Sequence, residues 1–210
     1  MAPYGAWRRH SNGVRALTSQ LDNFAANKTK QVAWLVSNCH AKNKRLEYAE
    51  ELGRHIGVDV YGACGTKRCG KTNQECLGML GREYKFYLSF ENSNCVDYIT
   101  EKFWSNALQH NMLPIVMGAS LQDYEAVAPP QSFIHVDSFQ SPEELAGYLH
   151  LLDQDDELYN QYFAWKDKGD FLATKFFCRV CSMLHYSKIY HQDWIDIQDW
   201  WAGPGVCAAK

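Results

Sequence analysis

The sequence predicts an α/β fold with a mostly parallel sheet of about five strands. Short apolar segments recur along the chain, segments of strong helix formers separate them, and Gly, Ser or Asn often follows the apolar segments. The first such segment, residues 31–36 (QVAWLV), ends at Ser37 and Asn38 and is continuous, which is typical of a strand buried on both faces. Parallel strands joined by helices cross over in the right-handed sense.

Each further element follows from a local signal. Residues 43–55 (NKRLEYAEELGRH) are rich in helix formers, and residues 58–61 (VDVY) form a short strand ended by Gly62. A Gly- and Cys-rich loop at residues 62–70 leads to a short helix at residues 72–80. The next expected elements are a strand at 85–90, a helix at 98–110, a strand at 113–117 and a strand at 133–136.

The last two expected helices have clear start signals. Ser141 is a favourable N-cap, Pro142 suits the first helical position, and two acids in the first turn complement the helix dipole. We expect this helix to end near Leu152 and the next to span residues 155–166. Beyond Gly169 the chain is aromatic and carries cysteines.

Composition and charge exclude two classes of protein. With 46% hydrophobic and 21% charged residues, the 210-residue chain is globular rather than disordered. Its net charge is -3, so a sequence-independent nucleic-acid binder, which carries a basic surplus, is not expected. The longest clean apolar run, residues 32–36, is far below the roughly 20 residues of a membrane helix. The first residues contain no apolar signal-peptide core.

Cysteines and a sequon point to an oxidising compartment. The chain has eight cysteines, with three crowded into residues 64–76 and a Cys178-x-x-Cys181 pair, a pattern that suggests disulfides. Asn27-Lys28-Thr29 is an acceptor sequon for N-glycosylation. A cytosolic protein with free thiols is the alternative.

Ligands of parallel α/β sheets bind where the strands end. No Gly-x-Gly-x-x-Gly or Walker loop follows the first strand, so side chains would have to hold the phosphates of a nucleotide. Residues 90–102 (FENSNCVDYITEK) can do so. We expect Asp97 to N-cap a helix on which Tyr98, Glu101 and Lys102 share one face.

A phenol, a carboxylate and an ammonium group on one face suit a nucleoside diphosphate. Lys102 would neutralise the pyrophosphate, Glu101 would accept from ribose hydroxyls, and Tyr98 would donate. Arg45, on the first helix, would add a bidentate phosphate contact. A solvated helix face with ordinary charges is the alternative, and the spacing alone favours it.

The same segment resembles a family signature. Residues 84–93 (YKFYLSFENS) with residues 97–102 (DYITEK) are similar to the signature of the α1,3-fucosyltransferases, glycosyltransferase family 10, and the resemblance runs from about residue 31 to the C-terminus. Residues 58–65 and 199–207 look most like the invertebrate and plant branch, which fucosylates the innermost N-acetylglucosamine of N-glycans. Further matching segments are 113–118 (LPIVMG), 123–125 (DYE), 129–130 (PP) and 132–137 (SFIHVD).

The resemblance implies a GT-B fold of two Rossmann-like domains, with this chain as the C-terminal, donor-binding half. It implies that fucose passes from GDP-fucose to an N-glycan acceptor with inversion and without a metal or other cofactor. It also implies the Golgi lumen, with a membrane anchor in the full-length protein. In these terms, residues 1–30 are the end of the acceptor domain and a linker, residues 31–168 bind GDP-fucose, and residues 169–210 pack back on the domain or its partner half.

Site residues follow from the match to the motif. By resemblance, the donor contacts are Asn92, Tyr98, Glu101 and Lys102, and Arg45 is the phosphate-binding arginine. No catalytic residue is expected in this chain, because the family's base carboxylate belongs to the acceptor domain. The alternative to an active fucosyltransferase is a silent fragment that binds GDP-fucose without turnover. Further donor-site candidates are Ser37, Asn38, Tyr61 and Glu91. The disulfide candidates are Cys64, Cys69, Cys76, Cys178, Cys181 and Cys207.

Two metal-like motifs have simpler interpretations. Asp153-x-Asp155 is similar to the Asp-x-Asp metal site of other glycosyltransferases, but it lies in an acidic run between two expected helices and is interpreted as a solvated junction. Cys178-x-x-Cys181 with His185 supplies only part of a zinc site, since structural zinc needs four ligands. No metal site is therefore predicted.

Overall fold

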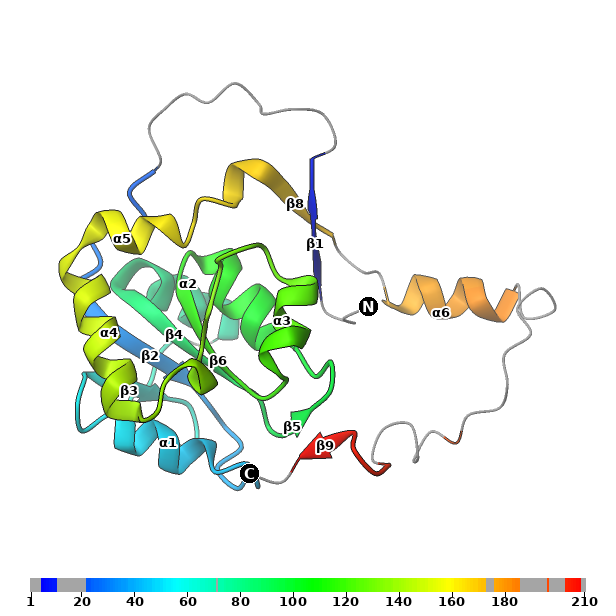
Figure 1. The fold of residues 1–210 in the computed structure, drawn as a ribbon, viewed down its shortest axis with the longest axis horizontal. Coiled ribbons are helices and arrows are strands. Elements are labelled where there is room, and N and C mark those ends of the chain that lie inside the picture. The colour runs from blue at the N-terminus through cyan, green and yellow to red at the C-terminus, as the bar shows by residue number, and fades with distance from the viewer. Residues whose placement is uncertain are drawn as a thin grey trace.

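A parallel sheet of five strands forms the centre of the protein, with the order β3-β2-β4-β6-β7 (Figure 1). The computed structural model describes residues 5–10, 22–70, 72–172, 176–185, 196 and 203–208. Each pair of neighbouring strands is parallel, so the predicted fold class is confirmed. The strands are Lys30–Leu35 (β2), Val58–Tyr61 (β3), Tyr84–Phe90 (β4), Leu113–Met117 (β6) and Ile134–His135 (β7).

Both faces of the sheet are covered, which explains the continuous apolar runs of its central strands. Val32 and Trp34 of β2 pack in one core cluster with residues of α1 and α4. Ala33 and Tyr87 point to the opposite face, where they pack with residues of α2. The helices are Arg45–Leu52 (α1), Asn73–Glu83 (α2), Leu121–Val127 (α3), Pro142–Gln154 (α4), Asp156–Gln161 (α5) and Phe176–His185 (α6).

The predicted helix starts in the second half of the chain are confirmed. The Ser141 side chain accepts from the Glu144 backbone N–H, and Pro142 opens α4. Asp155 caps α5 by accepting from the N–H groups of Glu157 and Leu158. The predicted helix over residues 155–166 is shorter than expected: α5 ends at Gln161, and turns lead to a 3-10 helix, Lys166–Lys168.

The predicted helix at residues 98–110 is wrong in its first turn. Asp97 has a φ of 57°, a left-handed conformation, and does not cap a helix. The regular segment is a π-helix, Lys102–Ala107, followed by a 3-10 helix, Leu108–His110. The physical reason is a side chain from elsewhere, because the Thr100 backbone N–H donates to the Glu91 carboxylate at 2.8 Å.

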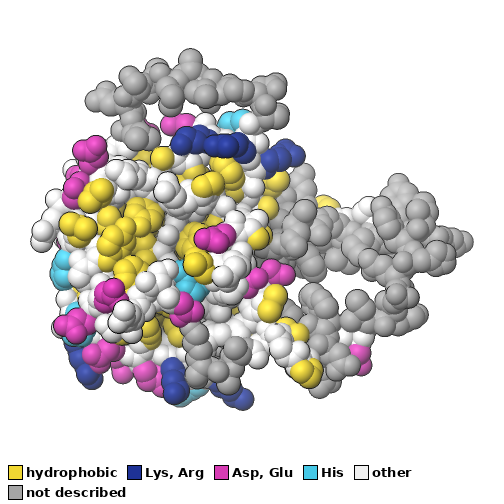
Figure 2. All heavy atoms as spheres, in the orientation of Figure 1, with side chains coloured by type: hydrophobic (Ala, Val, Ile, Leu, Met, Phe, Trp, Pro, Cys, Tyr) yellow, Lys and Arg dark blue, Asp and Glu magenta, His cyan; other side chains and the backbone are white. Residues whose placement is uncertain are grey.

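Two short antiparallel ribbons join distant parts of the chain. Ala6–Arg9 (β1) pairs with Gly169–Leu172 (β8), and Asn94–Cys95 (β5) pairs with Cys207–Ala208 (β9). On the face drawn in Figure 2, small groups of Lys and Arg near β8 and near α1 are separated by acidic and hydrophobic side chains. None of the described helices has the length and apolar character that crossing a membrane requires.

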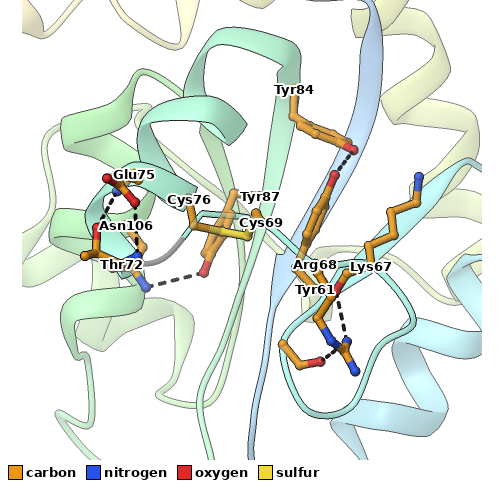
Figure 3. The surroundings of a disulfide bond; sticks show 11 residues. Tyr61, Lys67, Arg68, Cys69, Thr72, Glu75, Cys76, Tyr84, Tyr87 and Asn106 are labelled. Carbon is orange, nitrogen blue, oxygen red and sulfur yellow. Dashed lines mark hydrogen bonds between the residues drawn. A yellow bond between two sulfur atoms is a disulfide. The ribbon is translucent and has the colours of Figure 1, made fainter.

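Three disulfides tie the loops of the described chain: Cys39–Cys64, Cys69–Cys76 (Figure 3) and Cys95–Cys207. Of the predicted disulfide candidates, Cys64, Cys69, Cys76 and Cys207 each form a disulfide. Cys39 and Cys95 were not among the predicted residues. Their partners become visible only in space, since Cys39 and Cys64 follow neighbouring parallel strands and Cys95 meets Cys207 through the β5–β9 ribbon.

The disulfide candidates Cys178 and Cys181 bond to no cysteine of the described chain. Both thiols are free and exposed on α6, which lies apart from the central sheet in Figure 1. We therefore expect an alkylating agent applied under denaturing, non-reducing conditions to label two of the eight cysteines, Cys178 and Cys181. Peptide mass mapping identifies the labelled residues. Eight labelled cysteines from a secretory host would contradict the assignment to an oxidising compartment.

The disulfides should differ in their effect on stability. Cys95 and Cys207 are 112 residues apart, whereas Cys69 and Cys76 are 7 apart. Chain entropy then predicts a loss of about 5 kcal/mol in the free energy of unfolding for Cys95→Ala with Cys207→Ala. The matched pair Cys69→Ala with Cys76→Ala should lose about 2 kcal/mol. Denaturant titration measures both, and an equal or reversed order would refute the argument from loop length.

Candidate functional site

Glu91 stands at the centre of the predicted site residues, directly after β4. Its backbone N–H donates to the carbonyl of Met117 at the end of β6 (2.8 Å), and its own carbonyl accepts from Asn43 Nδ2 (3.0 Å). The residue is completely buried. Glu91 therefore links the ends of β4 and β6 to the loop that leads into α1.

The Glu91 carboxylate anchors residues 97–102, the second part of the motif that resembles the family signature. It accepts from the backbone N–H and the hydroxyl of Thr100 (both 2.8 Å) and from Lys102 Nζ (2.9 Å). Lys102 Nζ also lies 2.8 Å from Thr100 Oγ1 and 3.3 Å from Glu101 Oε1. The ammonium group of Lys102 is thus surrounded by oxygen atoms and is anchored in the protein.

A glycine makes room for this arrangement. Gly118, just after β6, has a φ of +147°, and a Cβ atom there would lie 2.7 Å from Cβ of Glu91. A larger residue at this position would displace Glu91. The glycine that ends the predicted strand is thus needed for close approach as well as for its backbone conformation.

Burial and charge set the ionisation of this pair. Burial raises the pKa of Glu91, and the adjacent Lys102 ammonium and the Thr100 hydrogen bonds oppose that shift. Burial also lowers the pKa of Lys102, but Glu91 and Glu101 outweigh it and raise the pKa. Each charge therefore depends on the other, as expected of a buried ion pair.

Arg45 is built into the same edge of the sheet. Its guanidinium donates to the carbonyls of Phe90 and Asn38, each at 2.7 Å, and lies 5.7 Å from the centre of the Trp34 ring. Arg45 is only 2% exposed, and its Nε has no hydrogen-bond partner among the described residues. It bridges the loops after β2 and β4, so a phosphate contact would be additional to this structural role.

Asn92, Tyr98 and Glu101 are partly exposed residues of the site. Tyr98 is half-buried; burial raises its pKa, Glu91 and Glu101 raise it further, and Lys102 and a hydrogen bond with Asn92 act in the opposite direction. The Glu101 side chain is 45% exposed, against 17% for Lys102. The predicted trio of Tyr98, Glu101 and Lys102 is thus brought together, but by the Glu91 network instead of a helix face.

The further donor-site candidates Ser37, Asn38 and Tyr61 separate into two groups. Ser37 and Asn38 are exposed in the loop after β2, next to Arg45. Tyr61 lies elsewhere: it is 4% exposed, and its hydroxyl is 2.8 Å from that of Tyr84 (Figure 3). The Tyr84 hydroxyl also donates to Asp59 at 2.6 Å. Because Tyr84 is the first residue of β4, the Tyr61 side chain runs back along the sheet, away from Glu91.

Sequence reasoning missed three polar residues of this edge. Thr100 lies within the motif at residues 90–102, but nothing in the residue spacing indicates that it is the partner of Glu91. Asn43 and Asn94 form a buried amide pair, with Asn43 Nδ2 3.1 Å from Asn94 Oδ1. The other amide atoms of this pair, Asn43 Oδ1 and Asn94 Nδ2, have no partner among the described residues.

The Asp-x-Asp sequence has structural roles. Asp153 accepts from Gln31 and pairs with Lys85, while Asp155 caps α5. In the described ranges, no three His, Cys, Asp or Glu side chains gather as a metal-binding group.

Comparisons with known proteins point to one family. A family model, "Glycosyltransferase family 10 (fucosyltransferase) C-term", matches residues 25–200. The chain is 53% identical to glycoprotein 3-alpha-L-fucosyltransferase A of Drosophila melanogaster, over 100% of this chain and 42% of the relative. It is 41% identical to alpha-(1,3)-fucosyltransferase C of the same organism, over 83% of this chain and 41% of the relative. The chain thus spans about two fifths of the length of these curated relatives.

Solved structures share the fold. A crystal structure of an alpha1,3-fucosyltransferase with GDP-fucose matches with a TM-score of 0.59 and 23% identity, over 78% of this chain and 50% of that one. A second, with GDP, has a TM-score of 0.61 and 21% identity, over 78% of this chain and 48% of that one. At such identities the likeness shows the fold alone.

Removing Lys102 should destabilise the protein, because the Glu91 carboxylate would remain buried without its ion partner. For Lys102→Met we expect a loss of roughly 3–5 kcal/mol in the free energy of unfolding, measured by denaturant titration at neutral pH. Glu91→Gln combined with Lys102→Met should lose less than Lys102→Met alone. The matched control is Lys42→Met, at an exposed lysine.

The pH dependence of Lys102→Met provides a second readout. Without Lys102, burial outweighs the Thr100 bonds and the nearby Arg45 charge, so the folded-state pKa of Glu91 lies further above the unfolded value of 4.5. The folded state then binds more protons, and stability should fall as pH rises from 4.5 through the raised pKa. A variant as stable as Lys42→Met across this range would show that the pair is not needed.

Proposed function

The chain belongs to glycosyltransferase family 10, the fucosyltransferases, and from this membership we propose that it is the donor-binding half of an α1,3-fucosyltransferase that uses GDP-fucose. The observation that carries the proposal is the group of Asn92, Tyr98, Glu101 and Lys102 at the carboxyl edge of a parallel sheet, where such folds bind nucleotides. These four side chains match the family motif. The loops that bear them are fixed by the buried Glu91.

Each side chain has a role in the proposed complex. The ammonium group of Lys102 neutralises the diphosphate, and the exposed carboxylate of Glu101 accepts hydrogen bonds from the ribose hydroxyls. Tyr98 and Asn92 add polar contacts beside Lys102 and Glu101. Arg45, buried beneath these residues, adds positive charge. Lys102 gives up part of its bonding to Thr100 and Glu101 when it engages a phosphate, while Glu91 keeps it in place.

In the proposed reaction, a hydroxyl of the acceptor attacks the anomeric carbon of fucose as the bond from that carbon to the diphosphate oxygen breaks. The acceptor proton passes to a base carboxylate, which the family resemblance assigns to the acceptor half. Negative charge grows on the departing GDP, and Lys102 and Arg45 stabilise it electrostatically. Attack from the face opposite the departing diphosphate inverts the anomeric centre. As the family resemblance implies, we propose that the transfer needs no metal ion.

For the acceptor, we propose the innermost N-acetylglucosamine of N-glycans, in the Golgi lumen. Two observations support this: the relative with 53% identity is named for glycoprotein fucosylation, and the disulfides suit an oxidising compartment. A silent donor-half protein that binds GDP-fucose without turnover is the second candidate. It fits the same nucleotide-facing groups and differs only in the absence of transfer.

GDP should bind this chain equally well with and without divalent ions. Isothermal titration calorimetry in the presence of a chelator and then of Mg²⁺ or Mn²⁺ measures this directly. The physical reason is that, in the proposed complex, Lys102 exchanges its contact with Glu101 for the diphosphate, and the buried Arg45 adds positive charge nearby. Binding that requires a divalent ion would overturn the side-chain mechanism.

Glu101→Gln should weaken GDP binding by about 1.5–3 kcal/mol, the usual worth of a hydrogen bond to a charged group. Its exposed position means that the free energy of unfolding should change little. Glu125→Gln, at an exposed glutamate of α3, is the matched control and should bind GDP like the unchanged protein. Equal affinities of the two variants would remove Glu101 from the proposed contacts.

A polypeptide limited to these 210 residues should bind GDP but show little or no fucose transfer to a glycan. Placing an acceptor domain from a full-length relative in front of it should restore transfer, because the base carboxylate then returns. Glu101→Gln in that fusion should lower transfer again. Transfer by the bare chain at the rate of a full-length relative would show that the base lies within this sequence.

A further inference from the structure

The sequence contains one Asn-x-Ser/Thr sequon, Asn27-Lys28-Thr29, and the fold displays it on the surface. Asn27 ends a turn just before β2 and has a φ of 65°. The side chains of Asn27 and Thr29 are exposed, whereas Lys28 between them is partly buried. Both residues that define the sequon are thus accessible, and the Asn27 side chain makes no hydrogen bond within the described chain.

The turn is held in place by groups other than Asn27. The Ala26 N–H donates to the Asn23 carbonyl and the Lys28 N–H to the Ala25 carbonyl, each at 3.1 Å. Phe24 stacks on Phe163 with ring centres 4.7 Å apart. These contacts leave the Asn27 amide free to carry a bulky group without loss of packing.

Lys28 turns inward from the sequon. Its Nζ donates to the carbonyl of Asn111, which precedes β6 at the same edge of the sheet. Burial, followed by the charges of Lys166 and Lys85, lowers the pKa of Lys28 to about 7. The middle residue of the sequon therefore anchors the turn, and its neighbours on both sides face solvent.

The position keeps a modification away from the proposed donor site. Asn27 lies before the first residue of β2, and Glu91 lies after the last residue of β4. Because β2 and β4 are parallel neighbours, these two points are at opposite ends of the sheet. A large group on Asn27 would leave the carboxyl edge open.

The surface beside Thr29 is hollowed and polar. A depression of about 300 Å³ lies there and leaves space next to the sequon. Its lining residues are Thr29, Lys30, Gln31, Gly57, Asp59, Tyr84 and Asp153. The three disulfides suit an oxidising compartment, the setting of N-glycosylation.

We propose that Asn27 is an N-glycosylation site and that the protein is itself a glycoprotein. The oligosaccharide comes from a polyprenyl diphosphate carrier. A bond forms between Asn27 Nδ2 and the anomeric carbon of the first sugar, and the bond from that carbon to the diphosphate oxygen breaks. The amide loses one proton, and the carrier leaves as its diphosphate.

Expression in a eukaryotic secretory host tests the site by peptide mass mapping. The unchanged chain should carry a glycan on the peptide that contains Asn27, and peptide-N-glycosidase treatment should convert Asn27 to Asp. Thr29→Ala should abolish the glycan and leave Asn27, with its left-handed backbone, unchanged. Thr29→Ser should retain the glycan. Thr66→Ala, at an exposed threonine outside any sequon, is the matched control and should stay glycosylated.

Two results would overturn the proposal: an unmodified Asn27 in secreted protein whose six disulfide cysteines are oxidised, or a glycan that persists on Thr29→Ala. GDP affinity is measured on the same samples and should be equal for the unchanged chain and Thr29→Ala. Glycosylation and GDP binding are thus read separately, and failure of one leaves the other standing.

Discussion

A buried carboxylate, that of Glu91, is the constraint on which the candidate site depends. A charge without solvent is costly unless hydrogen bonds and an opposite charge surround it. Thr100 and Lys102 meet that need, and in doing so they fix the backbone that follows β4. The same hydrogen bonds also fix the positions of Tyr98 and Glu101, which are partly exposed and belong to the same short segment. The need to satisfy the buried Glu91 carboxylate therefore determines which polar side chains lie at the surface of the site.

Because the sheet is parallel, the hydrogen-bond partners of Glu91 lie at one edge of it. Since β2, β4 and β6 run in the same direction, the loops after them meet, and hydrogen bonds to Glu91 and Arg45 join those loops. The disulfides Cys39–Cys64 and Cys95–Cys207 tie the same region covalently. A site held in this way loses little freedom when a ligand binds, which lowers the entropic cost of binding the proposed donor. The sequon at Asn27 lies at the other end of the sheet and leaves this edge unobstructed.

Local sequence signals predicted most of the fold because their causes are local. The apolar runs of β2 and β4 follow from burial on both faces, and the start of α4 at Ser141 follows from one cap and one proline. The failed prediction, a regular helix from Tyr98, assumed that the nearest polar residue, Asp97, would cap it. The Thr100 N–H instead found Glu91, nine positions earlier in the chain, and no periodicity encodes that choice.

The sequence by itself determined the α/β class, the five strands and, through the motif in residues 84–102, membership of the family. Only the tertiary structure decided that Lys102 is half of a buried ion pair, that Tyr61 turns away from the site, and which cysteines join. The physical reason is separation along the chain. Secondary structure depends on residues a few positions apart, whereas ion pairs, buried hydroxyls and disulfides depend on which distant side chains share the same small, water-free volume.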